Sequence, residues 1–127
     1  MIGFKIMDFD KGEVKTLFHG LNGSRTVPRF TWLDANVKEG ASDGTGKRKY
    51  TAGWHVIESK EECLAYLARF SNLDNKVIVK VTTEGKRWRK EHSPAKGLWL
   101  CERMRIDGIV MFSASIVNRF MAGKEIV

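Results

Sequence analysis

The sequence predicts one α+β domain with a mostly antiparallel or mixed sheet and one principal helix. Three features indicate this fold class. Short runs of β-branched and aromatic residues recur along the chain, one longer amphipathic stretch lies near its middle, and turn-forming dipeptides separate the runs. The 127 residues fit a single domain, residues 1–127, and a chain of this length buries roughly two thirds of its unfolded surface.

The first residues predict a β-hairpin. Its strands are expected at Gly3 to Met7 and at Glu13 to Phe18. The segment between them, Asp8 to Gly12, has Asp and Gly at turn positions and predicts a loop of about five residues. The chain is therefore expected to open with two antiparallel strands.

The next segment predicts little regular structure. Pro28 makes Arg25 to Phe30 an irregular or edge segment, because proline cannot donate a hydrogen bond to a sheet. Trp32 to Asn36 predicts a single helical turn. Gly40 to Lys49 has three glycines in seven residues and predicts an exposed loop.

A strand that leads directly into the principal helix follows. Thr51 to Ile57 predicts a buried strand, in which Gly53 marks a bulge or a close backbone approach. Ser59 is expected to cap the helix Lys60 to Phe70, with Glu62 completing a capping box. The predicted core-facing stripe of this helix consists of Cys63, Leu64, Tyr66, Leu67 and Phe70.

The C-terminal half predicts three more strands. Lys76 to Thr83 is the clearest of them, whereas the polar segment Glu84 to Gly97 predicts a long loop or a bent edge ribbon. Leu98 to Ile106 alternates between its two faces and predicts a strand. Asp107-Gly108 then predicts a two-residue hairpin turn into the strand Ile109 to Phe112.

The last residues predict a short C-terminal helix. Ser113 or Ser115 is expected to cap it, and it is expected to run through Met121 and to end at Gly123. No internal repeat or low-complexity tract interrupts this order of elements.

The composition predicts a soluble protein without a membrane span. No apolar run approaches the roughly 20 residues of a transmembrane helix, and the first residues lack the pattern of a signal peptide. A cytoplasmic location is therefore expected. The two cysteines, Cys63 and Cys101, lie in predicted regular elements, where cytosolic thiols are usually buried; a disulfide or a metal pair is the minor alternative.

Positive charge is concentrated in the C-terminal half. The net charge is +7, with +1 in residues 1–63, +6 in residues 64–127 and +5 in residues 86–105 alone. This local excess favours an anionic partner, either nucleic acid or an acidic or nucleoprotein partner, with a solvated basic loop as the alternative. Cations can neutralise phosphates while an indole between them stacks on a base or a sugar. The candidate residues are Lys86, Arg87, Trp88, Arg89 and Lys90, together with Lys47, Arg48 and Lys49.

Two histidines and one glutamate are the candidates for a pocket. His19 ends a strand, where its ring can donate to or accept from a sugar hydroxyl, and His55 is expected to be structural if its strand turns it inward. Glu102 interrupts an apolar alternating face. We expect it to line a pocket or to pair with an arginine such as Arg25, Arg103 or Arg105. No metal site is expected, since the histidines and cysteines lack zinc-ligand spacing, and no P-loop, Rossmann glycine pattern or nucleophile elbow occurs.

Two segments resemble the poly-ADP-ribose polymerase branch of the ADP-ribosyltransferase fold. Leu17 to Gly20, followed by Ser24-Arg25, is similar to the first motif of that branch, in which a histidine holds a ribose of NAD. Tyr50 to Leu67 is similar to the second motif, a glycine-aromatic strand that leads into a helix, although Trp54-His55 stands where the family has a tyrosine. The resemblance implies that NAD is a substrate. It implies His19 and Glu102 as catalytic residues and His19, Gly20, Tyr50, Trp54 and His55 as NAD-binding residues.

The chain also resembles small uncharacterised proteins of bacteriophages and bacteria. Lys15 to Arg25, Tyr50 to Val56 and Lys90 to Ile106 carry this resemblance. It brings no activity with it. It implies a phage accessory role in the cytoplasm of a bacterial host, such as binding a host nucleoprotein or a defence component.

Two main hypotheses of function result. The first is a small basic accessory protein that binds nucleic acid or a host nucleoprotein through residues 86–105. The second is an NAD-dependent ADP-ribosyltransferase-like enzyme, or a degenerate relative, in which Glu102 stabilises the positive charge that develops on the ribose. The second needs NAD as a substrate, and neither predicts a bound cofactor. A purely structural or protein-inhibitor role is a third possibility.

Overall fold

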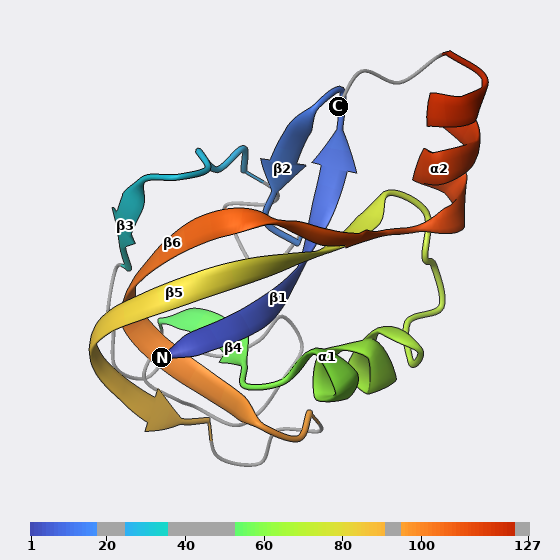
Figure 1. Cartoon of the computed structure of the whole chain (residues 1–127). Coiled ribbons are helices and arrows are strands. Elements are labelled where there is room, and N and C mark those ends of the chain that lie inside the picture. The colour runs from blue at the N-terminus through green and yellow to red at the C-terminus, as the bar shows by residue number, and fades with distance from the viewer. Residues whose placement is uncertain (18–24, 36–52, 91–94, 124–127) are drawn as a thin grey trace.

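The protein is an α+β domain built on one bent, antiparallel sheet (Figure 1). The computed structural model describes residues 1–17, 25–35, 53–90 and 95–123. This part of the chain contains six strands and two helices, and it confirms the predicted fold class. They are β1 (Ile2–Asp10), β2 (Glu13–Lys15), β3 (Trp32–Asp34), β4 (Trp54–Ile57), α1 (Lys60–Leu67), β5 (Lys76–Arg89), β6 (Leu98–Phe112) and α2 (Ala114–Met121).

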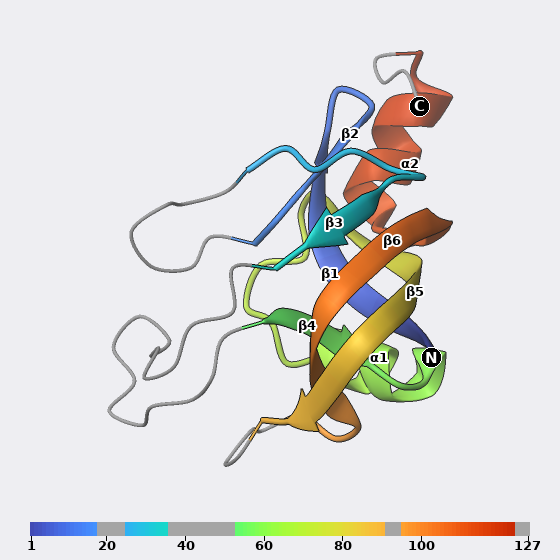
Figure 2. The same ribbon diagram turned by 90° about the vertical axis from the view of Figure 1, so that its left-hand side faces the viewer.

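Four of the strands close into a ring. β5 pairs with β1 on one edge and with β6 on the other, and β6 also pairs with β4. β1 and β4 meet at one residue pair, Phe4 and Ile57, which closes the ring. β2 pairs with the C-terminal end of β1, and β3 pairs with β6, so both strands extend the sheet beyond the ring. Figures 1 and 2 show β5 and β6 as two long, bent strands that run side by side.

Buried apolar side chains form two clusters. Burying one Val, Leu, Ile, Phe or Met side chain fully contributes about 1.5–3 kcal/mol, so these clusters are the main source of stability. The larger cluster draws on all four ring strands and includes Met7, Phe9, Val56, Val77, Val79, Val81, Cys101, Met104 and Ile106. The smaller cluster contains the two buried residues of α1, Cys63 and Leu67. Its other members are Ile6, Ile57, Ile78, Ala95 and Leu98.

α1 begins where its cap was predicted and ends earlier. The hydroxyl of Ser59 accepts a hydrogen bond from the backbone N–H of Glu62 (3.1 Å), which confirms the cap. The helix ends at Leu67, with Ala68 as its C-cap, because the amides of Arg69 and Phe70 bond three residues back in a tighter turn. Leu64 was wrongly placed on the buried stripe, since it is 38% exposed.

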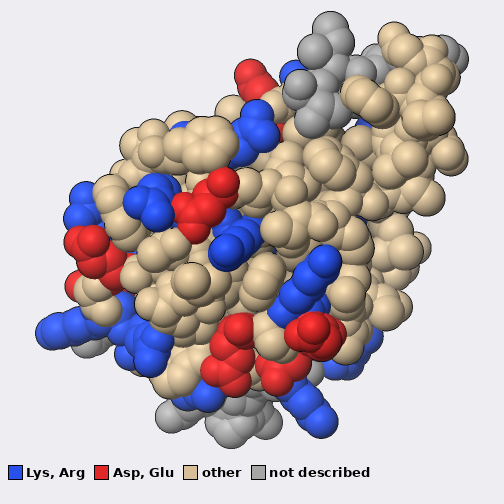
Figure 3. Space-filling view, in the orientation of Figure 1, with Lys and Arg blue, Asp and Glu red and all other residues tan. Residues whose placement is uncertain are grey.

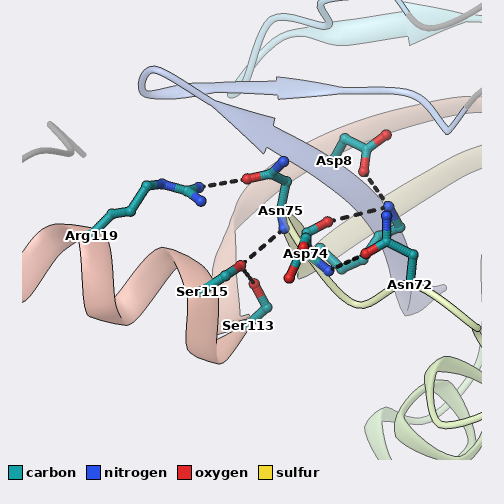
Figure 4. A network of polar contacts seen from close by, with 8 residues as sticks. Asp8, Asn72, Asp74, Asn75, Ser113, Ser115 and Arg119 are labelled. Carbon is teal, nitrogen blue, oxygen red and sulfur yellow. Dashed lines mark hydrogen bonds and ion pairs between the residues drawn. The ribbon is translucent and has the colours of Figure 1, made fainter.

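α2 is held to the sheet by a network of polar contacts (Figure 4). Asn75 has a positive φ of 63° in the turn before β5. Its backbone N–H donates to the hydroxyl of Ser115 (3.2 Å), and its side-chain carbonyl accepts from Arg119 (2.6 Å). Ser113 is the N-cap, and Gly123, with φ of 72°, follows the last turn as predicted.

The first hairpin is confirmed with a tighter turn than expected. β1 extends to Asp10 and β2 starts at Glu13, so only Lys11 and Gly12 form the turn. Both residues have positive φ (51° and 82°), which suits the right-handed twist of the paired strands. The five-residue loop was wrong because the Asp residues were given to the turn instead of the strand.

Two other predictions are wrong, and a third is decided between its two alternatives. Trp32 to Asp34 forms strand β3 instead of a helical turn, because it pairs with β6. For Glu84 to Arg89, which were predicted as a long loop or a bent edge ribbon, the ribbon is right, because β5 continues through them with a bulge. β6 runs unbroken past Asp107-Gly108, where a hairpin turn was expected.

Bulges explain why β6 does not turn at Asp107. The register between β5 and β6 shifts twice near this point, leaving Asp107 and Val110 as extra residues on β6. The Asp107 carboxylate accepts hydrogen bonds from Thr82 (2.5 Å) and from Arg105 (2.7 Å). Gly108 is not among the positive-φ glycines, so the conformation that a two-residue turn needs does not form.

Candidate functional site

Two tryptophans at the bend of β5 and β6 each lie against two arginines. In both cases the arginines stand two residues apart on the neighbouring strand, so their side chains share the face that bears the tryptophan. We call these clusters the Trp99 unit and the Trp32 unit. The Trp99 unit comprises Trp99, Arg87, Arg89 and Glu58, and the Trp32 unit comprises Trp32, Arg103, Arg105, Asp34, Glu84 and Asp107.

The Trp99 unit brings together a tight cation–π stack and a single carboxylate. The guanidinium carbon of Arg89 lies 3.8 Å from the ring centroid of Trp99, and that of Arg87 lies 5.0 Å from it. Glu58 accepts from the indole N–H of Trp99 (2.8 Å) and lies 3.6 Å from Arg89. Arg87 forms no ion pair with a carboxylate in the described part of the chain.

The Trp32 unit has a similar stack but more carboxylates. Arg103 and Arg105 lie 5.1 Å and 4.9 Å from the Trp32 ring centroid. Three carboxylates occupy the two guanidinium groups. Arg103 lies 3.3 Å from Asp34 and 2.8 Å from Glu84, and Arg105 lies 2.7 Å from Asp107.

Charge at Asp107 is stabilised within the Trp32 unit. Burial raises the pKa of the Asp107 carboxyl, but hydrogen bonds from Thr82 and Arg105 and the nearby positive charges outweigh this effect. The pKa of Asp107 is therefore held below its usual value of 3.8. The carboxylate form is thus favoured where it binds Arg105.

A bulge separates the two units along β5. The register shifts between Glu84 and Arg87, and Gly85 has a φ of 83°. The backbone N–H of Lys86 donates to the Glu102 carboxylate (2.9 Å), and a Cβ at Gly85 would overlap that carboxylate. Glu102 therefore has a structural partner, but this partner is a backbone amide and not one of the arginines proposed from the sequence.

The sequence-predicted basic cluster is divided between two faces of β5. Arg87 and Arg89 belong to the Trp99 unit, whereas Trp88 lies opposite Leu100 on the alternate face. Lys90 approaches the His55 ring (Nζ to Nε2, 3.1 Å). A Cβ at Gly53 would lie 2.8 Å from the carbonyl oxygen of Cys101 and 3.0 Å from the Trp88 ring, which confirms the predicted close backbone approach at this glycine.

Trp54 and His55 have structural contacts in β4. The Trp54 indole N–H donates to the carbonyl of Leu33 (3.1 Å), and the ring packs against the larger apolar cluster. The carbonyl of His55 accepts from the Lys5 ammonium (2.8 Å). β1 and β4 pair only at Phe4, so Lys5 takes the place of a ladder hydrogen bond beyond that point.

Lys5 is the most perturbed amine in the described part of the chain. Burial lowers its pKa to about 8, an effect that the nearby thiols of Cys101 and Cys63 partly oppose. Burial raises the pKa of Cys63 to about 12 and that of Cys101 to about 11, while the Lys5 charge lowers both. Both cysteines are free and buried, as predicted.

Three findings concern metal ligands, membrane spans and the six predicted site residues that fall outside the described part of the chain. The described residues contain no group of three or more His, Cys, Asp or Glu side chains that could hold a metal ion. None of the helices in the described ranges is long and apolar enough to span a membrane. The residues that lie outside the described part are His19, Gly20, Lys47, Arg48, Lys49 and Tyr50.

Sequence reasoning missed two residues of the Trp99 unit. Trp99 stood in the predicted strand Leu98 to Ile106, but nothing paired it with Arg89 until β5 was known to continue. Glu58 follows β4 directly and meets Trp99 because β4 pairs with β6. In Figure 3, blue and red surfaces alternate on the left-hand side, where β5 and β6 bend, whereas the surface over α2 is mostly tan.

Comparisons with protein-family models, curated proteins and solved structures found no match for this chain.

Proposed function

We propose that the protein binds the phosphate backbone of nucleic acid through the Trp99 unit, assisted by the exposed Lys86. The observation that carries this proposal is the state of Arg87. Its guanidinium is stacked at 5.0 Å from the Trp99 centroid, and it has no carboxylate partner among the described residues. An arginine held in this way is prepared to bind an oxyanion from outside the chain.

The chemistry of guanidinium favours phosphate as that oxyanion. Its planar fork donates two parallel hydrogen bonds to a phosphate, and stacking on an indole restricts the side chain before binding, so less conformational entropy is lost. Lys86, Arg87 and Arg89 provide three exposed cations within four residues, and among the described residues only Glu58 contacts the stack as an anion. Binding is therefore expected to depend strongly on salt, because phosphate neutralisation releases counterions.

The test is a salt titration of oligonucleotide binding followed by fluorescence anisotropy. Hydrogen bonds to charged groups are worth about 1.5–3 kcal/mol, so Arg87→Gln is expected to weaken binding about tenfold or more. The slope of log affinity against log salt should also fall by about 0.7 to 0.9. Lys86→Gln should lower the slope as well.

Matched variants keep this test specific. Arg103→Gln removes a stacked arginine that already has two carboxylate partners, and Lys80→Gln removes an exposed lysine elsewhere on β5. Both should leave the affinity within about twofold and the slope unchanged. Equal losses in Arg87→Gln and Arg103→Gln, with circular dichroism showing folded variants, would reject the Trp99 unit as the binding site.

A further inference from the structure

The strand arrangement around the Trp99 unit limits the kind of nucleic acid that it fits. Over Trp99 to Cys101, β6 is paired on both of its edges, with β4 on one side and with Arg87 to Arg89 of β5 on the other. The unit therefore lies on a three-stranded surface. It is not carried by a free two-stranded ribbon.

A three-stranded surface is too broad to enter a DNA groove. The major groove is about 12 Å wide and admits one helix or a two-stranded ribbon. Three strands spaced about 4.8 Å apart already span about 10 Å between the axes of the outer strands, before any side chain is added. In addition, α1 begins two residues after Glu58 and broadens this edge further.

The stack itself offers a surface that suits an unpaired base. The Arg89 guanidinium lies 3.8 Å from the Trp99 centroid, and both Arg87 and Arg89 are exposed. Unstacked bases stack on guanidinium planes and on aromatic rings, whereas the bases of a duplex are already stacked on one another. A base laid on Arg89 would continue the Trp99–Arg89 stack.

We infer that the nucleic acid bound by the Trp99 unit is single-stranded, with a base stacked on the Arg89–Trp99 pair and phosphates bound by Arg87 and Lys86. This inference rests on the proposed function and adds the class of ligand to it. Arg87 and Arg89 stand roughly 7 Å apart along β5, which places two cations in line beside a strand that runs along the sheet. Because base stacking is not specific to sequence, the binding is expected to tolerate many sequences.

The experiment compares three ligands on the full-length protein. They are a single strand of about 16 nucleotides, the duplex of the same sequence, and a single strand of the same length that lacks most of its bases. One stacked base is worth about 1–3 kcal/mol, so the intact single strand should bind about tenfold tighter than the duplex and the abasic strand at equal salt. Trp99→Leu should remove this preference, while Trp32→Leu, the matched variant, should retain it.

The outcomes separate the two proposals. If the duplex or the abasic strand binds as tightly as the intact single strand, the single-strand inference is overturned while phosphate binding stands. If no ligand shows salt-dependent binding, the proposed function and the inference fail together. Because Trp99 is half-buried, the comparison of ligands on the unmodified protein decides the question even if Trp99→Leu does not fold.

Discussion

The Trp99 unit and the Trp32 unit each pair one tryptophan with two arginines, and they differ in the carboxylates that surround those arginines. In each, two arginines from the neighbouring strand lie within 5.1 Å of the centroid of one tryptophan. The Trp32 unit surrounds its arginines with three carboxylates, whereas the described residues bring one carboxylate to the Trp99 unit. The same pairing of arginines with a tryptophan therefore has its positive charge balanced by carboxylates in the Trp32 unit, and only partly balanced by the described residues in the Trp99 unit.

Strand register accounts for this difference. Arg103 on β6 stands directly opposite Asp34 of β3 and Glu84 of β5, so both neighbouring strands supply it with a carboxylate. Trp99 stands opposite Val56 of β4 and Arg89 of β5, and neither contributes an acid. Glu58 reaches the Trp99 unit only from the turn between β4 and α1.

The largest contrast is expected from a pair of double variants. Arg87→Gln with Arg89→Gln should weaken nucleic-acid binding about 100-fold, because two charged hydrogen-bond donors are lost. The same change in the Trp32 unit, Arg103→Gln with Arg105→Gln, should leave affinity unchanged. It should instead lower the free energy of unfolding by about 1 kcal/mol, since partly exposed ion pairs are each worth up to that amount. Anisotropy titration and urea denaturation measure the two effects, and equal effects of both pairs on affinity would contradict the distinction between the units.

A glycine substitution tests the bulge that separates the units. Gly85→Ala should lower the free energy of unfolding by about 2 kcal/mol, because left-handed backbone costs about 1–2 kcal/mol for a residue with a Cβ. The new Cβ would also displace the Glu102 carboxylate from the Lys86 amide. Gly108→Ala is the matched control, since a Cβ there meets nothing within 4 Å, and it should change stability by less than about 0.5 kcal/mol. Urea denaturation checks both values.

Local patterns in the sequence predicted the elements whose neighbours are close in the chain. Ser59 and Glu62 predicted the start of α1, and Gly123 predicted the end of α2, since capping depends on residues within one turn. Long-range pairing overrode local preference elsewhere. Trp32 became a strand through its pairing with β6, and Asp107-Gly108 became a bulge because Thr82 and Arg105 bind the aspartate.

The candidate site was only partly predictable for the same reason. The cations at Lys86 to Lys90 are visible in the sequence, but their division between two faces depends on β5 being a strand. The stack of Arg89 on Trp99 depends on a register between residues ten apart, and the contact with Glu58 depends on β4 pairing with β6. No local pattern encodes these contacts.

A smaller effect on affinity is expected when the carboxylate that contacts the Trp99 unit is removed. Glu58→Gln removes the carboxylate that lies 3.6 Å from Arg89 and keeps an oxygen that can accept from the Trp99 indole. The affinity for a single strand should rise about threefold and the salt slope should steepen, since an exposed ion pair is worth roughly 0.2–1 kcal/mol. Glu61→Gln, an exposed acid in the first turn of α1, should have a smaller effect in the same anisotropy titration. Unchanged or weaker binding by Glu58→Gln would show that this carboxylate does not compete with the nucleic acid.

The smallest effect is expected when the pH is lowered, and it concerns the contribution of the Trp32 unit to the free energy of unfolding. The pKa of Asp107 is lower in the folded protein than its usual 3.8, so its stabilising contribution is present above that pH and is lost as the pH falls through the folded value. Asp107→Asn should lower the free energy of unfolding by less than about 1 kcal/mol at neutral pH and reduce the loss of stability below the usual carboxyl pKa. Asp10→Asn removes a different carboxylate from the surface and should retain the steeper loss, as measured by urea denaturation across the acid range. Nucleic-acid binding at neutral pH should be the same in both variants, because Asp107 belongs to the Trp32 unit and makes no contact with the Trp99 unit.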